Sequence, residues 1–251
     1  MGTSSIFHGR NDKNPLLPDD YDESMEQIEP VTWQTVKSDL SKYINRQGDY
    51  VSSRHIISQY VRAAGGPGRA TSISSAGIKT GSQIGAFFHR VAQNGYRSTL
   101  ESLGIDFEDK SIQEVFSRLI DVLSPSANTK EECVARQAAQ AALVEIYDYV
   151  EQNNLDLSVL DNMPLDLANT VLCNYISSYI WMLMMKDLES RFEKYESNPE
   201  AAYRMEMDFK ETIHSIVEIE YKKKGDIITG NIERSISELY KACYSVLGGV
   251  V

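Results

Sequence analysis

The residue with the plainest chemistry in this chain is Gly2, in the opening run Met1-Gly2-Thr3-Ser4-Ser5. Removal of an initiator methionine leaves such a glycine with an unhindered α-amine. N-terminal myristoylation also begins with Met-Gly, but its pattern has Ser or Thr at the sixth position, where this chain has Ile6. We therefore interpret the α-amine of Gly2 as a site of chemical modification that the rest of the chain presents. We do not expect that modification to be a lipid.

The segment that carries Gly2 has no helical or strand periodicity before about Val31. It contains the run Pro15-Leu16-Leu17-Pro18, and its prolines favour an extended path. Acidic tails that contain proline commonly become ordered only when bound. We predict an extended, non-helical tail over residues 1–30, followed by a body over residues 31–251.

Catalytic and metal-binding constellations are missing from the sequence. It contains no phosphate-loop motif, no dinucleotide fingerprint after a strand, no His-Glu-x-x-His and no Cys-x-x-Cys. Some phosphate-loop residues occur in the run Gly77-Ile78-Lys79-Thr80-Gly81, but in the wrong order and without a preceding strand. The four histidines are far apart, and none has a second ligand at metal spacing: His8, His55, His89 and His214. We expect no enzyme activity, no cofactor and no metal.

Charge is distributed unevenly along the chain. Residues 1–40 carry a net charge of minus 5, residues 41–100 carry plus 7, and residues 101–251 carry minus 13, for a total of minus 11. Seven cations of the middle segment lie within about 52 residues: Arg46, Arg54, Arg62, Arg69, Lys79, Arg90 and Arg97. This segment is the part of the body whose composition suggests an interaction.

A glycine-rich stretch lies inside the basic segment, with Gly65, Gly66 and Gly68 around Pro67. We expect these residues to break any helix and to open an irregular loop that runs to about Gly85. Backbone N–H groups of such a loop, beside Arg62 and Arg69, would suit a phosphate or an acidic partner surface. Alternatively, the arginines pair with the acidic remainder of the same chain. Nucleic acid is a further candidate partner, but the overall charge and the lack of interleaved aromatic residues disfavour it.

Apolar residues recur at helical spacing along almost the whole body, and no segment alternates like a strand for long. The sequence therefore predicts an all-α fold, a multi-helix bundle with a basic part over residues 31–104, including the glycine-rich loop, and an acidic part over residues 105–251. Ser111-x-x-Glu114 forms a capping box. The predicted helices cover about residues 32–44, 56–64, 84–94, 111–123, 134–150, 165–195, 205–217 and 232–247.

Composition also bears on location. The odd number of widely spaced cysteines, Cys133, Cys173 and Cys243, fits reduced thiols, and the first 30 residues contain no apolar run of a signal peptide. The run from Val171 to Met185 is shorter than the roughly 20 residues that a bilayer requires. We expect a cytoplasmic protein without a membrane span.

These residues together resemble a known family. The start Met1-Gly2-Thr3-Ser4-Ser5, Gly9, the run Pro15-Leu16-Leu17-Pro18 and the segment from Tyr60-Val61-Arg62 to Gly65-Gly66-Pro67-Gly68-Arg69-Ala70 are similar to the B component of the Qat anti-phage defence system. The resemblance covers about the first 100 residues, mainly the N-terminal tail, and is faint over the helical remainder.

The resemblance implies a non-enzymatic partner in a bacterial operon that also encodes an ATPase, a QueC-like enzyme and a TatD-type nuclease. The QueC-like enzyme would add a deazaguanine to Gly2 after cleavage of Met1, with Thr3, Ser4 and Ser5 as the recognised neighbours. The helical body would dock on partners of the system. A nucleic-acid-binding adaptor that acts through residues 41–100 is the second hypothesis, and an enzyme with an unfamiliar site is the third.

Overall fold

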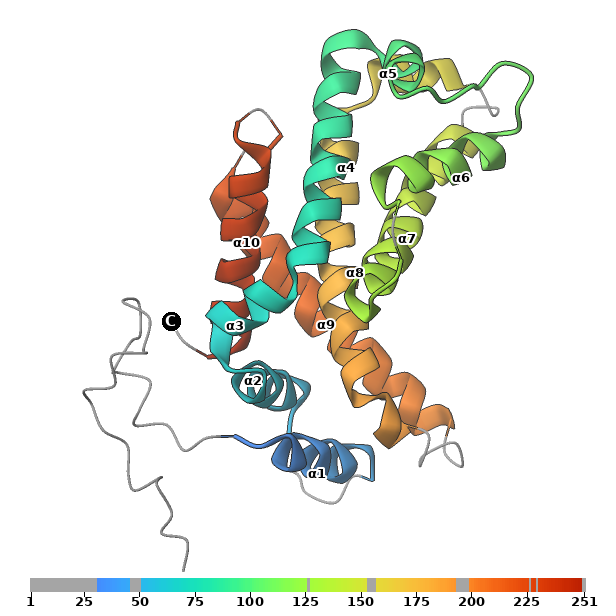
Figure 1. Ribbon diagram of the computed structural model, residues 1–251. Coiled ribbons are helices and arrows are strands. Elements are labelled where there is room, and N and C mark those ends of the chain that lie inside the picture. Colours follow the sequence, from blue (N-terminus) through green and yellow to red (C-terminus); the bar gives the residue numbers. More distant parts are fainter. Residues whose placement is uncertain are drawn as a thin grey trace, which may run out of the picture. The chain divides into compact units, whose positions relative to one another are not determined.

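The computed structural model describes residues 31–45, 51–125, 127–152, 157–192, 199–225, 227–228 and 230–249. The chain divides between Pro30 and Val31 into two units, and all described residues belong to the second. Regular structure in these residues is entirely helical (Figure 1), which confirms the all-α prediction. The elements are α1 (Trp33–Ile44), α2 (Ser53–Ala63), α3 (Gly66–Ile73), α4 (Ser75–Asn94), α5 (Tyr96–Ser102), α6 (Ile112–Leu123), α7 (Lys130–Gln152), the 3-10 helix η2 (Leu157–Asn162), α8 (Leu165–Phe192), α9 (Pro199–Lys224) and α10 (Ile232–Leu247).

Side-chain caps explain where several helices begin. Thr32 accepts a hydrogen bond from the Thr35 N–H at 3.2 Å and caps the start of α1. The capping box of α6 is also confirmed, because the Glu114 N–H donates to Ser111 Oγ while the Ser111 N–H donates to Glu114 Oε2. Each such bond satisfies a backbone donor that the helix itself leaves unpaired.

The predicted loop between Gly65 and Gly85 is wrong, because this stretch forms α3 and most of α4. Gly65 and Gly66 supply the turn, with φ values of 98° and 83°. Pro67 stands in the first turn of α3, where a missing N–H costs nothing. The later glycines lie inside α4, and two of them, Gly77 and Gly81, allow aromatic rings to pack directly on the helix backbone.

One helix begins with the help of a distant residue. The carboxylate of Asp161, in η2, accepts hydrogen bonds from the backbone N–H groups of Tyr96 at 2.8 Å and Arg97 at 3.2 Å. These are first-turn donors of α5, which follows Gly95 at φ 80°. Neither α5 nor η2 was predicted from the sequence, and the carboxylate that caps α5 lies 65 residues away from it in the chain.

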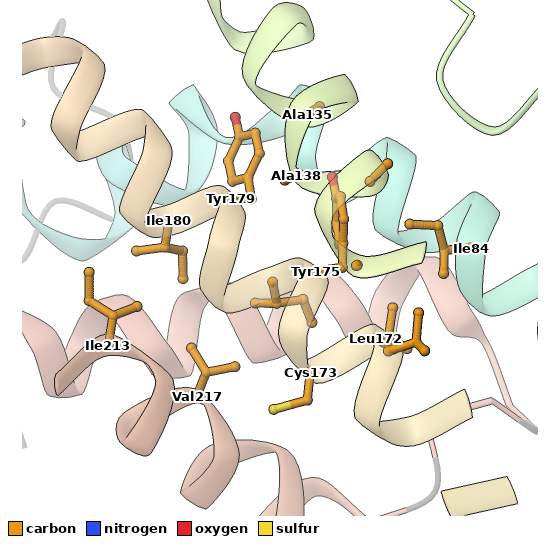
Figure 2. Close-up of a cluster of buried hydrophobic side chains, with 14 of the residues drawn as sticks. Ile84, Ala135, Ala138, Leu172, Cys173, Tyr175, Tyr179, Ile180, Ile213 and Val217 are labelled. Carbon is orange, nitrogen blue, oxygen red and sulfur yellow. The ribbon is translucent and has the colours of Figure 1, made fainter. Parts of the chain in front are cut away.

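The long helix α8 lies at the centre of the body, with α4, α7 and α9 packed along it (Figure 1). Figure 2 shows Tyr175 and Tyr179 of α8 directed toward α4 and α7, and Ile180 facing Ile213 and Val217 of α9. The Tyr175 hydroxyl donates to the Gly77 carbonyl oxygen at 2.9 Å. A single hydrophobic core therefore joins helices of the basic and the acidic parts.

The helix predicted around residues 165–195 is α8, and it is buried along much of its length. Among the described residues no helix is long and apolar enough to cross a bilayer.

Candidate functional site

The predicted site residues fall into two groups. The tail residues Gly2, Thr3, Ser4, Ser5, Pro15, Leu16, Leu17 and Pro18 lie outside the described residues, as does Arg46. The others, Arg62, Gly65, Gly66, Gly68 and Arg69, come together where α2 ends and α3 begins. We call this place the α2–α3 junction.

Backbone geometry accounts for two glycines of the junction. The Ala64 N–H donates to the Tyr60 carbonyl at 2.9 Å and the Gly65 N–H to the Arg62 carbonyl at 3.1 Å, which closes α2. The left-handed conformations of Gly65 and Gly66 then turn the chain into α3. Gly65 and Gly66 thus have a structural role that does not require a ligand.

The two cationic residues of the junction differ in exposure. Arg69 is exposed, and its side-chain stem lies over Gly65, where a Cβ would come within 3.1 Å of Arg69 Cβ and Cγ. Arg62 is half-buried in the last turn of α2, where its charge favours the helix C-terminus. Gly68 is exposed in the first turn of α3, and a Cβ there would meet nothing within 4 Å.

These arginines do not pair with the acidic remainder that the structure describes. Within the described residues, Arg54, Arg62, Arg69 and Arg97 form no ion pair. The pKa of Glu132 is lowered mainly by hydrogen bonds from the Asn128 and Thr129 N–H groups. The positive charge of Lys79 lowers it further by a smaller amount. The junction therefore presents guanidinium groups that an anionic partner could bind.

A pocket of about 300 Å³ adjoins the junction. It lies where α1, α2, α3, α7, α8 and α10 meet, and we call it the Trp33 pocket. Its walls are Trp33, Lys37, Tyr60, Ala64, Ala70, Ile73, Lys130, Glu131, Leu183, Asp187 and Tyr244. Trp33 is 39% exposed and meets the edge of Tyr60, with ring centroids 5.6 Å apart. A half-exposed tryptophan at the rim of a partly apolar pocket is typical of a recognition site.

A polar cluster forms one side of the Trp33 pocket. The Tyr60 hydroxyl donates to Asp187 Oδ2 at 2.9 Å, and Lys130 Nζ lies 2.5 Å from Asp187 Oδ1. Burial, together with the nearby Tyr244 and Asp187, raises the pKa of Tyr60 well above its usual value. Burial opposes the charge on Lys130, but the hydrogen bond and the charge of Asp187 prevail and raise the pKa of Lys130. Both carboxylate oxygens of Asp187 thus already have partners in Tyr60 and Lys130. This arrangement favours a structural role for Asp187 in the pocket wall over a role in proton transfer.

The residues of this pocket were not predicted from the sequence. Trp33, Lys130 and Asp187 come from three helices, and no spacing in the chain connects them. A signal existed for Trp33, since it is one of only two tryptophans and directly follows the N-cap of the first helix.

A second pocket, of about 440 Å³ between α8 and α9, contains residue types used in thiol catalysis: Cys173, His214 and Asn174. The His214 Nε2 and Asn174 Oδ1 atoms lie 2.9 Å apart. Burial, followed by the charge of Glu218, raises the pKa of Cys173 to about 11. At neutral pH only about one such thiol in 10⁴ is a thiolate, the reactive form. Among the described residues no group of three or more His, Cys, Asp or Glu side chains could hold a metal ion.

Comparison with known proteins places the body of the chain in a family. A family model described as Qat anti-phage system associated protein QatB matches residues 65–247. No curated protein and no solved structure matches the chain. The match begins at Gly65 and covers the body from α3 to α10, so its place is the reverse of the expectation that the resemblance lies mainly in the N-terminal tail.

Proposed function

Because the chain belongs to the QatB family of the Qat anti-phage system, we propose that it is a non-enzymatic accessory protein of that system whose N-terminus is modified by a partner enzyme. In this proposal a QueC-like enzyme adds a deazaguanine to Gly2 after Met1 is removed, and the helical body docks on other proteins of the system. The family match is the observation that carries it. The family is described as a system-associated protein, and its description names no reaction.

The tail sequence supports the first half of the proposal. Gly2 has no side chain to obstruct entry into an enzyme pocket, and Thr3, Ser4 and Ser5 are small neighbours that a narrow pocket can accept. The chain divides after Pro30, so Gly2 belongs to a different unit from the packed helices. Pro15-Leu16-Leu17-Pro18 would be a second contact with the partner enzyme.

The α2–α3 junction and the Trp33 pocket support the second half. Arg62 and Arg69 have no acidic partner among the described residues, and the adjoining pocket offers an aromatic wall of Trp33 beside Ile73 and Leu183. An acidic surface of a partner that also carries an apolar side chain would satisfy both features.

Phage plating efficiency on cells that carry the complete system tests the proposal. Gly2→Glu places a bulky side chain after Met1, which blocks methionine removal, and we expect protection to fall to the level of cells without the system. Asn14→Ala, in the same tail but outside the proposed contacts, is the matched control and should protect fully. Full protection by Gly2→Glu at wild-type protein level would contradict the role of Gly2.

The second candidate function is a nucleic-acid-binding adaptor that acts through residues 41–100. Arg54, Arg62 and Arg69 favour it, because they form no ion pair within the described part of the chain. Such binding to duplex or single-stranded DNA would weaken steeply as salt is raised. It would also be lost in Arg62→Glu and Arg69→Glu. Retention of system proteins that depends on these arginines, without DNA binding, would support the accessory role instead.

A further inference from the structure

A valley runs along α8 between α7 and α9. Both helices pack along α8, whereas α7 and α9 make no comparable contact with each other. Two adjacent pockets, of about 440 and 260 Å³, follow this valley and share Asn174 and His214. The floor of the smaller pocket consists of Asn174, Ser177, Ser178, Trp181 and Met182, which lie on one stripe of α8.

One wall of the valley is a stripe of α9. Lys210, His214 and Glu218 line the two pockets, at the three-to-four-residue spacing of a single helix face. The same spacing extends the stripe in the N-terminal direction to Met207 and Tyr203, which are 46% and 62% exposed. Met207 and Tyr203 are among the exposed large apolar side chains of the described residues. They therefore extend the α9 wall of the valley beyond its two pockets.

The two ends of the valley differ in chemistry. At one end Met182 lies beside Trp181, whose ring is covered by the Lys210 ammonium at 4.2 Å from the ring centroid. The Trp181 Nε1 atom is buried and has no hydrogen-bond partner among the described residues. Methionine and aromatic side chains form adaptable apolar surfaces that accept partner helices.

The other end of the valley is polar and acidic. Asn174 Nδ2 donates to Glu145 Oε1 of α7 at 3.1 Å, and Asn174 Oδ1 meets His214 of α9. Asp166 and Glu218 add two more carboxylates, of which Glu218 is paired with Lys222 at 2.6 Å. A cationic partner segment is the natural complement of this end.

We propose that this valley docks an amphipathic helix of another protein of the system. The apolar face of that helix lies on Met182, Met207 and Tyr203, and basic residues at one end meet Glu145 and Asp166. From Asp166 to Met182 the valley spans about 24 Å along α8, and Tyr203 lies about 10 Å beyond Lys210 along α9, so a helix that contacts both ends has about 23 residues. A second copy of this chain is a poorer occupant. Its residues 101–251 carry a net charge of minus 13, so they would be repelled by the carboxylates that line the valley. The proposal goes beyond the function above, which uses the tail and the α2–α3 junction.

Capture of the tagged full chain, co-expressed with the ATPase, the QueC-like enzyme and the TatD-type nuclease, tests the proposal. Retained proteins are quantified by mass spectrometry. We expect Met207→Glu and Tyr203→Glu each to lower the retention of one of them at least tenfold, and Glu145→Lys to lower it as well. The matched control is Ile219→Glu, because Ile219 is 52% exposed on α9 but lies off the valley stripe. Thermal unfolding followed by circular dichroism verifies that all four variants remain folded.

Three outcomes would overturn the proposal. The first is wild-type retention in both Met207→Glu and Tyr203→Glu. The second is a wild-type chain that retains none of the three proteins. The third is a wild-type dimer in light scattering that becomes a monomer in Met207→Glu, since this result would place a second copy in the valley. An unchanged complex in the Gly2→Glu variant would separate this docking from the modification of the tail.

Discussion

At the scale of single residues, Gly77 and Gly81 decide how closely α8 approaches α4. A Cβ on Gly77 would lie 2.5 Å from the ring of Tyr179, and a Cβ on Gly81 would lie 3.0 Å from the ring of Tyr175. Both rings are buried, so they cannot turn away into solvent. The missing methyl group is therefore a condition for the packing of the two helices, and the helix-propensity cost of glycine is offset by that contact.

Substitution of these glycines gives a residue-scale prediction. We expect Gly77→Ala to lower the free energy of unfolding by about 1–3 kcal/mol, because the added methyl overpacks the contact with Tyr179. Gly68→Ala is the matched control, since it also lies in a helix, with open space around it. There alanine should stabilise the protein by up to about 1 kcal/mol. Urea denaturation measures both, and equal effects in the two variants would contradict this account of the glycines.

At the scale of elements, local signals determine several helices and tertiary contacts determine the rest. Ser111 and Glu114 lie three residues apart in the chain, so the start of α6 could be predicted from the sequence. The stretch from Gly65 to Gly85 could not, because its glycines are explained by Tyr175, Tyr179 and the positive φ of a single turn. A single sequence cannot distinguish a glycine that ends a helix from a glycine that makes room for a neighbouring aromatic ring.

The capping box supplies the element-scale prediction. We expect Ser111→Ala to destabilise the protein by about 1 kcal/mol, because the Glu114 N–H loses its acceptor. Ser98→Ala, at an exposed position of α5, should change stability by less than about 0.5 kcal/mol. Thermal unfolding of both variants checks this difference, and a Ser111→Ala midpoint equal to that of Ser98→Ala would argue against the cap.

At the scale of the whole molecule, buried tyrosines dominate the centre of the body. Their rings form a continuous chain of contacts from Tyr175 through Tyr179 and Tyr240 to Tyr244, with centroids 5.8 to 6.4 Å apart. Burial is the main cause that raises the pKa of these four hydroxyls, and also those of Tyr60 and Tyr96, above their ordinary value. The folded body therefore holds the protons of these six tyrosines, which the unfolded chain releases near pH 10.

This difference predicts the stability of the body in alkali. Below about pH 10 both states keep these protons, and stability is fully present. Above it the unfolded chain binds fewer protons than the folded one, so each such tyrosine removes about 1.4 kcal/mol of stability per pH unit. We expect helical circular dichroism to be lost in one cooperative step above about pH 10, together with the part of the tyrosinate absorbance that these six residues contribute. Titration of these tyrosines near pH 10 without loss of helix would contradict their burial.

The candidate surfaces differ in how far the sequence alone reveals them. The basic segment and its arginines were evident from the charge of residues 41–100. The Trp33 pocket was not, because it needs Tyr60 from α2, Lys130 from α7 and Asp187 from α8 at one place. The valley over α8 could not be predicted for the same reason. The exposed Met207 and Tyr203 of α9 indicate a binding surface only when Trp181 and Met182 of α8 are known to lie along the same valley.

The central claim is that Gly2 is the modified residue of a system-associated protein. Mass spectrometry of the intact chain and of its N-terminal peptide tests it most directly, with the chain expressed beside its operon neighbours and again without the QueC-like enzyme. We predict loss of Met1 and an added mass on Gly2 only when that enzyme is present. An unmodified Gly2 in both samples would contradict the claim and leave the α2–α3 junction as the leading candidate for the functional surface.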